Sequence, residues 1–298
     1  MQTTDLRGIV SMLGAVFFFS LLDACLKQLA ATYPPLQVAF LRGAAGLPFV
    51  VAMTALRHHW RVLIPVRWPL HILRGVMSVI TLYSFVYAVS VLSLADAYSI
   101  FLVAPLLVTG LSMPMLGERV GWQQWTAICV GLLGALIILR PTGVGFITLG
   151  GLAALVSATF YAVGVILIRV ATRTDTAPAT VFWTLLVLTI VAGVLSIPGW
   201  TAVRAEHWTW IVAIGVTGGI AQLLLTDAFR RCAASVVAPF EYSALLWGVS
   251  LDWLVWHVLP NQRMFFGAAI VVGSGLYLIY RERTNAPRHA QSVSASDV

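Results

Sequence analysis

The sequence predicts an all-α integral membrane protein with ten transmembrane helices, arranged as two inverted five-helix repeats. The 298-residue chain is 60% hydrophobic and only 10% charged, with a mean hydropathy of +0.92, which is typical of a protein that lies mostly in lipid. Apolar runs of about 20 residues, the length that crosses a bilayer core, recur along the chain. The two halves of the chain also align with each other.

Ten spans follow from these runs, which are separated by short charged or Pro- and Gly-rich stretches. Their length and their weak alternation of apolar and polar residues argue against barrel strands. The spans cover residues 8–30, 36–56, 69–90, 95–116, 121–139, 146–168, 178–198, 208–228, 235–256 and 264–280. The polar, small-residue-rich stretch 284–298 is predicted to be a disordered tail.

The positions of Lys and Arg predict the orientation of the chain. With a cytoplasmic N-terminus, the outer loops hold only Arg140, Arg204 and Arg263. The cytoplasmic ends and loops then hold Arg7, Arg57, Arg61, Arg67, Arg119, Arg169, Arg173, Arg230, Arg231, Arg281, Arg283 and Arg288. Positive charge concentrates on the cytoplasmic side of membrane proteins, so both termini are predicted to be cytoplasmic.

The chain aligns with itself at an offset of about 142 residues, the repeat offset. Gly8–Lys27 lies on Gly150–Arg169, and near the ends of the halves Leu132–Arg140 lies on Gly273–Arg281. Each half therefore holds five spans, and an odd number inverts the second half relative to the first. The predicted domains are the N-terminal repeat 1–141 and the C-terminal repeat 142–283.

Several motifs are similar to those of a known transporter family. Ala97–Leu139 contains a Pro-rich helix, a Gly-Glu-Arg turn and a Gly-x-x-Gly helix, and Cys232–Tyr242 places Ala-Ser ahead of an apolar helix. Gln37–Gly46 has an Arg before small residues, and Lys27 ends the first span. Together they resemble the EamA type of the drug/metabolite transporter superfamily over nearly all of the ten-span region. The second half departs from the pattern, because Val255–Gln262 replaces the expected second Gly-Glu.

The resemblance implies a secondary transporter that moves amino acids, nucleobase-type metabolites or drugs, usually out of the bacterial cytoplasm. Two repeats of opposite orientation have two equivalent arrangements, one open to each side of the membrane, as alternating access requires. The 11% content of Phe, Trp and Tyr favours an amino-acid exporter of the bacterial inner membrane, as a monomer or homodimer. A passive channel or facilitator, a lipid-handling protein, and a carrier of nucleotide-like or drug-like metabolites stay open as alternatives.

Other classes of protein find little support. The sequence has no HExxH, Gly-x-Ser-x-Gly or Walker motif, and its six His have no metal-ligand spacing. We therefore expect no enzyme, no cofactor and no metal site. The net charge of +7 is scattered over short loops, which predicts contacts with lipid headgroups and no nucleic-acid partner.

An acid and a base lie in the first span, where an ionised group costs between about 3 and more than about 10 kcal/mol. Asp23 and Lys27 share one helical face with Val16 and Ser20, so this face should look into the protein. In one interpretation Asp23 forms a structural ion pair with Lys27 or with Arg42 of the next span. In the other, the three charges form a gate or a substrate contact at the outer end of a central cavity.

Helical spacing predicts further faces that look into this cavity. We expect the first, third, fourth, sixth, eighth and ninth spans to line it and the fifth and tenth to be peripheral. Tyrosines and a glutamine would suit a planar or medium-sized polar solute, although each tyrosine could instead pack in the core or at the lipid interface. The candidates are Tyr83, Tyr87, Tyr98, Phe101, Ser157, Tyr161, Gln222, Glu241 and Leu245. Pro105 removes a backbone hydrogen bond and is expected to kink the fourth span.

Glu241, about two turns into the ninth span, has two interpretations. It pairs with Arg74, Arg230 or Arg231 on the cytoplasmic side, or it is a carboxylate that exchanges one proton in each transport cycle. Asp227, beside Arg230 and Arg231, is predicted to be an ion-paired helix end. Arg74 is predicted to lie near the cytoplasmic surface.

Overall fold

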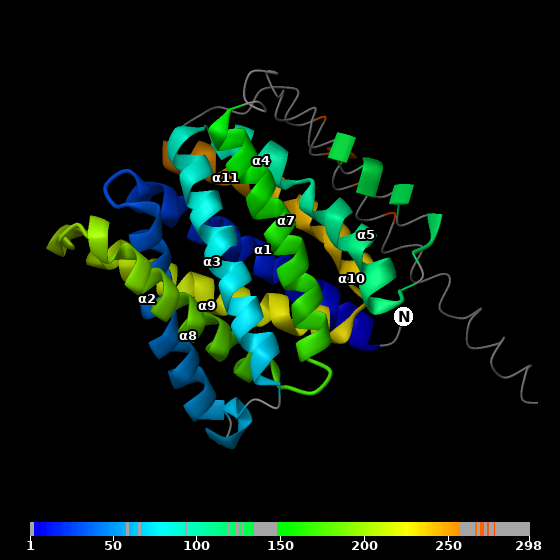
Figure 1. Ribbon diagram of the computed structural model, residues 1–298. Coiled ribbons are helices and arrows are strands. Elements are labelled where there is room, and N and C mark those ends of the chain that lie inside the picture. Colours follow the sequence, from blue (N-terminus) through cyan, green and yellow to red (C-terminus); the bar gives the residue numbers. More distant parts are fainter. Residues whose placement is uncertain are drawn as a thin grey trace, which may run out of the picture.

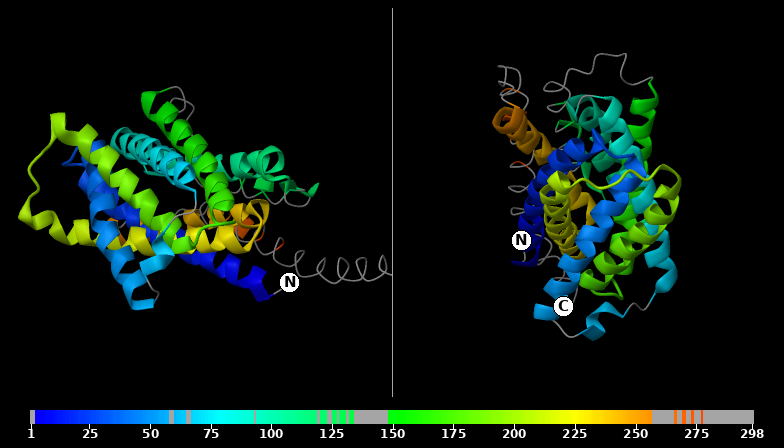
Figure 2. Two further views of the ribbon diagram at one scale, coloured as in Figure 1. Left: turned by 60° about the horizontal axis from the view of Figure 1, so that its bottom comes forward. Right: turned by 90° about the vertical axis from the view of Figure 1, so that its left-hand side faces the viewer.

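A computed structural model of the chain describes residues 3–57, 60–64, 67–92, 94–118 and 148–256, and also 120–122, 125–126, 128–130, 132–133, 266, 269–270, 273 and 277. These residues form a bundle of helices (Figure 1, Figure 2), with no strand among them. The all-helical prediction is thus confirmed for the described part of the chain. The predicted fifth and tenth spans lie mostly outside that part, and the tail 284–298 lies wholly outside it, so ten helices remain a prediction.

Within the described ranges, six helices are long and apolar enough to cross a membrane. They correspond to the predicted first, second, third, sixth, seventh and eighth spans. These helices are α1 (Thr3–Ala30), α2 (Pro35–Arg57), α3 (Trp68–Val91), α7 (Leu149–Ala171), α8 (Ala177–Ser196) and α9 (Trp208–Arg231), with the 3-10 helices η1 (Trp60–Leu63), η2 (Ile197–Gly199) and η3 (Ala205–His207) between them.

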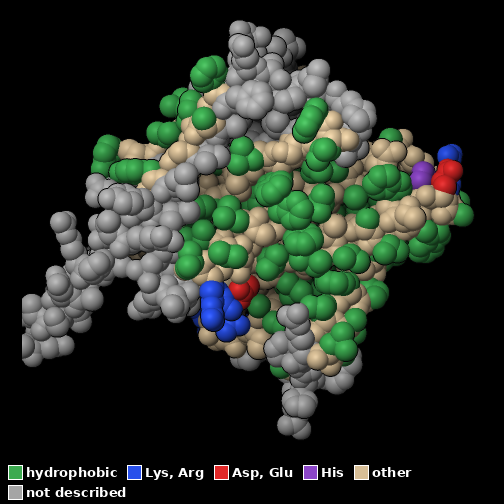
Figure 3. All heavy atoms as spheres, turned by 180° about the vertical axis from the view of Figure 1, so that it is seen from behind, with side chains coloured by type: hydrophobic (Ala, Val, Ile, Leu, Met, Phe, Trp, Pro, Cys, Tyr) green, Lys and Arg blue, Asp and Glu red, His purple; other side chains and the backbone are tan. Residues whose placement is uncertain are grey.

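The surface of the bundle is suited to lipid. Each of the six long helices exposes large apolar side chains, such as Val10 of α1, Leu152 of α7 and Val212 of α9. Figure 3 shows a face on which hydrophobic side chains predominate and charged side chains gather near the edges. An apolar band between charged rims is the pattern that a bilayer selects.

The predicted fourth span is broken into two helices, α4 (Leu94–Phe101) and α5 (Ala104–Leu116). The break falls at Leu102 and Val103, and Pro105 lies in the first turn of α5. Because proline has no N–H group, the hydrogen-bond ladder of α4 cannot continue through it. The kink expected at Pro105 is confirmed.

The predicted ninth span is also interrupted, which corrects its description as a single helix over 235–256. It consists of α10 (Ala234–Val237), the 3-10 helix η4 (Ala238–Ser243) and α11 (Ala244–Trp256). Pro239 lies in the first turn of η4 and interrupts the backbone hydrogen bonds in the same way. The tighter 3-10 turn carries Glu241.

The long helices contact one another in a reciprocal pattern. α1 packs against α9 and α3 against α7, α2 packs against α8, and the contact of α2 with α9 has a counterpart in that of α8 with α3. Each helix has an equivalent in the other half (α1 and α7, α2 and α8, α3 and α9). Exchanging equivalents converts α1–α9 into α7–α3 and α2–α9 into α8–α3, and leaves α2–α8 unchanged. A two-fold relation between repeats produces this pattern.

α5 ends in a glycine turn, and the residue after this glycine contacts the second half of the chain. Gly117 has a φ of 69°, in the left-handed region where glycine meets no steric penalty. The chain leaves the helix there, and Glu118 accepts a hydrogen bond from the backbone N–H of Ala234 at 3.0 Å and lies 3.6 Å from Arg169 Nε. This is the Gly-Glu-Arg turn of the sequence, whose Arg119 lies outside the described residues.

Candidate functional site

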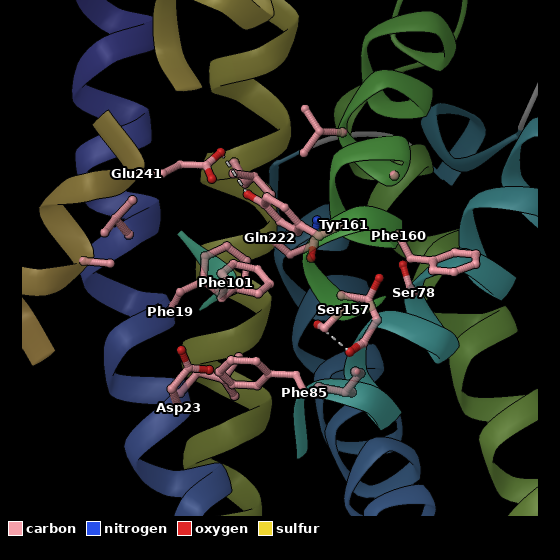
Figure 4. Close-up of a pocket in the computed structure, with 18 of the residues that line it drawn as sticks. Phe19, Asp23, Ser78, Phe85, Phe101, Ser157, Phe160, Tyr161, Gln222 and Glu241 are labelled. Carbon is pink, nitrogen blue, oxygen red and sulfur yellow. Dashed lines mark hydrogen bonds between the residues drawn. The ribbon is translucent and has the colours of Figure 1, made fainter. Parts of the chain in front are cut away.

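A cavity of about 160 Å³ lies among helices of both halves. Figure 4 shows side chains from several helices that converge on it. All six spans expected around the cavity contribute to its lining, and α2 contributes through Arg42. Its wall is mostly apolar, with a few polar groups, as in small-molecule sites generally.

Most of the predicted site residues line this cavity. They are Ser20, Asp23, Tyr98, Phe101, Ser157, Tyr161, Gln222 and Glu241, with Arg42 of the predicted gate. The side chain of Leu245 lies outside the described part of the structure. Lys27, the other predicted gate residue, is half-buried and is not part of the lining.

Tyr83 and Tyr87 do not reach the cavity, so their expected placement is corrected. Tyr83 is 42% exposed on the surface of the bundle, where an amphipathic ring is suited to the lipid interface. The face of α3 that lines the cavity instead carries Arg74, Ser78 and Thr81. Their spacing of i, i+4 and i+7 is a helical stripe, and these polar residues were the signal that could have identified the face.

Asp23, on α1, is held by a phenol. The Tyr98 hydroxyl, from α4, donates a hydrogen bond to Asp23 Oδ2 at 2.6 Å. Arg42 is near enough for its charge to attract that of Asp23, but the described side chains form no ion pair between these two residues. The predicted direct pair of Asp23 with Arg42 is therefore wrong.

Glu241 is held in the same way in the second half. The Tyr161 hydroxyl, from α7, donates a hydrogen bond to Glu241 Oε1 at 3.1 Å, and Glu241 is 7% exposed. The interpretation that paired Glu241 with an arginine is wrong for the described side chains. Asp227 does form the predicted ion pair at the end of α9, 2.6 Å from Arg231 Nε.

Aromatic rings connect the two carboxylate sites, which lie at opposite ends of the cavity in Figure 4. The ring centroids of Tyr98 and Phe85 are 6.1 Å apart, those of Phe85 and Phe101 are 5.5 Å apart, and those of Phe101 and Tyr161 are 5.3 Å apart. The cavity therefore has an aromatic wall between two acidic ends. Such a wall can stack against a planar or apolar solute body.

Arg74 is a cavity residue that the sequence analysis missed. It is 3% exposed, and its Nη1 donates to the Thr180 carbonyl at 2.9 Å and to the Thr184 hydroxyl, both on α8. It is thus buried in the bundle, and its predicted place near the cytoplasmic surface stays a prediction. Acceptors that α8 supplies make this burial possible.

The helical bundle and its amphipathic cavity define a membrane transport protein. Residues 6–140 and residues 148–281 each match the EamA-like transporter family. The chain belongs to this family and contains its repeat twice. Members of the family are transporters and not enzymes.

Full-length relatives carry different small molecules. The pseudopaline exporter CntI of Pseudomonas aeruginosa is 29% identical over 266 residues, 89% of this chain and 93% of its own length. The riboflavin transporter of Vibrio cholerae is 26% identical over 95% of this chain and 96% of its own. The S-adenosylmethionine uptake transporter of Rickettsia prowazekii is 23% identical over 94% and 95%.

A solved crystal structure has the same fold, with a TM-score of 0.77 over 91% of this chain and 96% of its own at 20% identity. From the family and these relatives, the chain is a multi-pass membrane transporter of small metabolites in the drug/metabolite transporter superfamily.

Proposed function

We propose that this protein exports amino acids or related small metabolites across the bacterial inner membrane by alternating access. The observation that carries the proposal is the lining of the cavity, where Asp23 and Arg42 bring opposite charges together beside an aromatic wall. A zwitterion with an apolar body suits this lining, because its charged ends need polar partners at membrane depth and its body can stack on the rings.

Alternating access fits the architecture. Two inverted repeats over 1–141 and 142–283 would supply two equivalent arrangements of one cavity, and the reciprocal helix contacts favour such a relation. The distribution of arginines favours cytoplasmic termini. Outward transport agrees with the name of the pseudopaline exporter, whereas the S-adenosylmethionine relative is an uptake transporter, so direction has to be measured.

The test is transport by the purified protein in liposomes, with labelled phenylalanine, tyrosine, tryptophan, leucine and methionine. We expect saturable uptake and counterflow, in which unlabelled substrate inside drives entry of label, for at least one of them. A passive channel would give no counterflow. Movement of riboflavin or S-adenosylmethionine without movement of any amino acid would show that the proposed substrate class is wrong.

We also propose Glu241 as the group that couples transport to protons, because it is a buried carboxylate that lines the cavity. Glu241→Gln should retain counterflow but lose the acceleration that an imposed proton gradient produces. Glu206→Gln is the control, since this side chain is 66% exposed in η3, and it should respond to the gradient like the wild type. An unchanged response of Glu241→Gln would exclude Glu241 from coupling.

A further inference from the structure

Arg42 is a buried cation for which the described protein supplies no acceptor. It lies on α2, is 9% exposed and lines the cavity. No hydrogen bond joins any of its guanidinium nitrogens to the described residues, and its Nε is fully buried without a partner. The charge of Asp23 attracts that of Arg42, but the Asp23 carboxylate accepts its hydrogen bond from Tyr98. Proteins rarely bury a charged group without a partner, because the lost hydration is not replaced.

Arg74 is a second arginine of the same cavity, and its contacts are those of an arginine with a structural role. It too is buried and lines the cavity, but its guanidinium donates to the Thr180 carbonyl and to the Thr184 hydroxyl. Thr184 lies 142 positions after Arg42, so the Arg74 guanidinium is bound at the position of the second half that corresponds to Arg42. The two arginines differ in whether the described protein supplies their acceptors.

We propose that Arg42 binds the carboxylate of the transported metabolite and that Asp23 binds its ammonium group. A guanidinium presents donors in a planar fork that matches a carboxylate, and Asp23 has acceptor capacity beyond its bond to Tyr98. A doubly charged phosphate is disfavoured, because the Asp23 carboxylate would repel it. The assignment rests on the proposed function and narrows the substrate class to small zwitterions with a free carboxylate.

A substrate that lacks the carboxylate should be rejected. It would leave the Arg42 guanidinium unpaired in the closed site, and a site built to bond a polar group discriminates strongly against analogues without that group. Phenylalanine and phenylalaninamide are suitable probes because they have the same aromatic body and ammonium group. At about pH 6, where the ammonium groups of both are protonated, they differ only in whether the carboxylate is free or is a neutral amide.

The experiment measures the affinity of the purified protein for each probe from ligand-induced thermal stabilisation. The acid and amide forms of tyrosine, tryptophan, leucine and methionine are tested in the same way. The wild type should prefer the acid to the amide by at least about tenfold in one or more pairs. Arg42→Gln should reduce this preference to about onefold. Arg42→Lys, which keeps the charge without the fork, should give an intermediate value and shows that the position tolerates substitution.

Arg169→Gln is the matched control, because Arg169 lies outside the cavity lining and donates within the protein, to the Phe229 carbonyl at 2.8 Å. Its thermal stability should fall, while its preference for acid over amide should stay at the wild-type value. The assignment is overturned if no acid stabilises the wild type better than its amide, or if Arg42→Gln keeps the preference. It is also overturned if Arg169→Gln loses the preference to the same extent.

Failure of the proposed function would look different. Carboxylate-dependent stabilisation that disappears in Arg42→Gln, without movement of any labelled amino acid across liposomes, would support the binding assignment and contradict amino-acid transport. Transport of amino acids with equal preference for acids and amides would support amino-acid transport and contradict the binding assignment.

Discussion

Each carboxylate that lines the cavity is bound by one tyrosine hydroxyl, but the two halves order the pair differently. In the first half the acid, Asp23, lies on α1 and the phenol, Tyr98, on α4; in the second the phenol, Tyr161, lies on α7 and the acid, Glu241, on η4. Tyr98 and Glu241 are 143 positions apart, within one residue of the repeat offset. Either order satisfies a buried carboxylate with a donor, so the repeats can preserve the bond while exchanging the residues.

Removing the phenol hydroxyl tests this bond. Tyr98→Phe keeps the ring but leaves Asp23 without its donor, so the free energy of unfolding in detergent should fall by about 1–3 kcal/mol. Tyr83→Phe is the control, because the Tyr83 ring is on the surface of the bundle, and it should change stability by less than about 0.5 kcal/mol. Equal losses in both variants would show that the bond to Asp23 contributes nothing specific.

A second variant set separates a gate from a scaffold in the cluster of Asp23, Lys27 and Arg42. Removal of one member of a buried ion pair destabilises by about 3–5 kcal/mol, whereas removal of both can be nearly neutral; the direction of this effect carries over to Asp23 and Arg42, whose charges attract without direct contact. Asp23→Asn should therefore lower thermal stability. Asp23→Asn with Lys27→Gln and Arg42→Gln should regain stability but remain impaired in liposome transport. Transport at the native rate by the triple variant would leave the cluster only a structural role.

At the scale of helices, small residues allow the close contacts between the two halves. A methyl group built on Gly215 of α9 would lie 2.5 Å from the carbonyl oxygen of Ala45 on α2, and Gly75 of α3 lies against Val187 of α8. Ala45 and Val187 are 142 positions apart, so the two contacts are equivalent in the repeats. Glycine at such crossings lets helix backbones approach in a membrane.

Gly215→Ala should separate α2 from α9, because the added methyl group meets backbone atoms that have no rotamer to change. We expect a loss of about 1–3 kcal/mol in unfolding free energy, measured by denaturant titration in detergent. Gly110→Ala in α5 adds a methyl group with no atom within 4 Å, and its higher helix propensity should stabilise by about 0.5–1 kcal/mol. A Gly215→Ala variant as stable as the wild type would show that this contact tolerates separation.

At the scale of the whole molecule, polar contacts join the halves at several places outside the cavity. Two of these sets of contacts bear on the mechanism, and others, such as that of His71 with Asp175, also join the halves. In the first set, the Gln37 side-chain amide exchanges hydrogen bonds with the backbone of Thr201, and Tyr33 contacts His207 at 2.8 Å. In the second set, Glu118 accepts a hydrogen bond from the N–H of Ala234, at the start of α10. Under the proposed mechanism these two sets would break in turn, because each access state opens the bundle on one side only.

The predicted topology can be checked with single cysteines in a background where Cys25, Cys129 and Cys232 are changed to serine. A cysteine at position 57 should react with an impermeant thiol reagent only from the cytoplasmic side, and a cysteine at position 140 only from the outside, because the predicted second and fifth spans end on opposite sides. Position 140 lies outside the described residues, so labelling also tests whether the predicted fifth span crosses the membrane. Reaction of both from one side would contradict the inverted arrangement.

The sequence by itself determined the class of the protein and most of the polar residues that line the cavity. The hydropathy of a segment is a sum over its own residues and does not depend on which helices pack against it. The six long helices could therefore be located from the sequence. A charge in a span must avoid lipid, and this placed Asp23 and Glu241 in the interior. Proline acts on its own helix, so the kink at Pro105 could also be predicted.

Only the tertiary structure decided which groups meet. The bond of Asp23 to Tyr98 spans 75 positions in the chain, and its existence depends on the distance between two helices, which no periodicity encodes. Tyr83 was assigned to the cavity in error, because a tyrosine is suited both to a polar cavity and to the lipid interface. That no described residue accepts a hydrogen bond from Arg42 is also a property of the packed molecule, since a guanidinium is unsatisfied only when the surrounding helices exclude other acceptors from it.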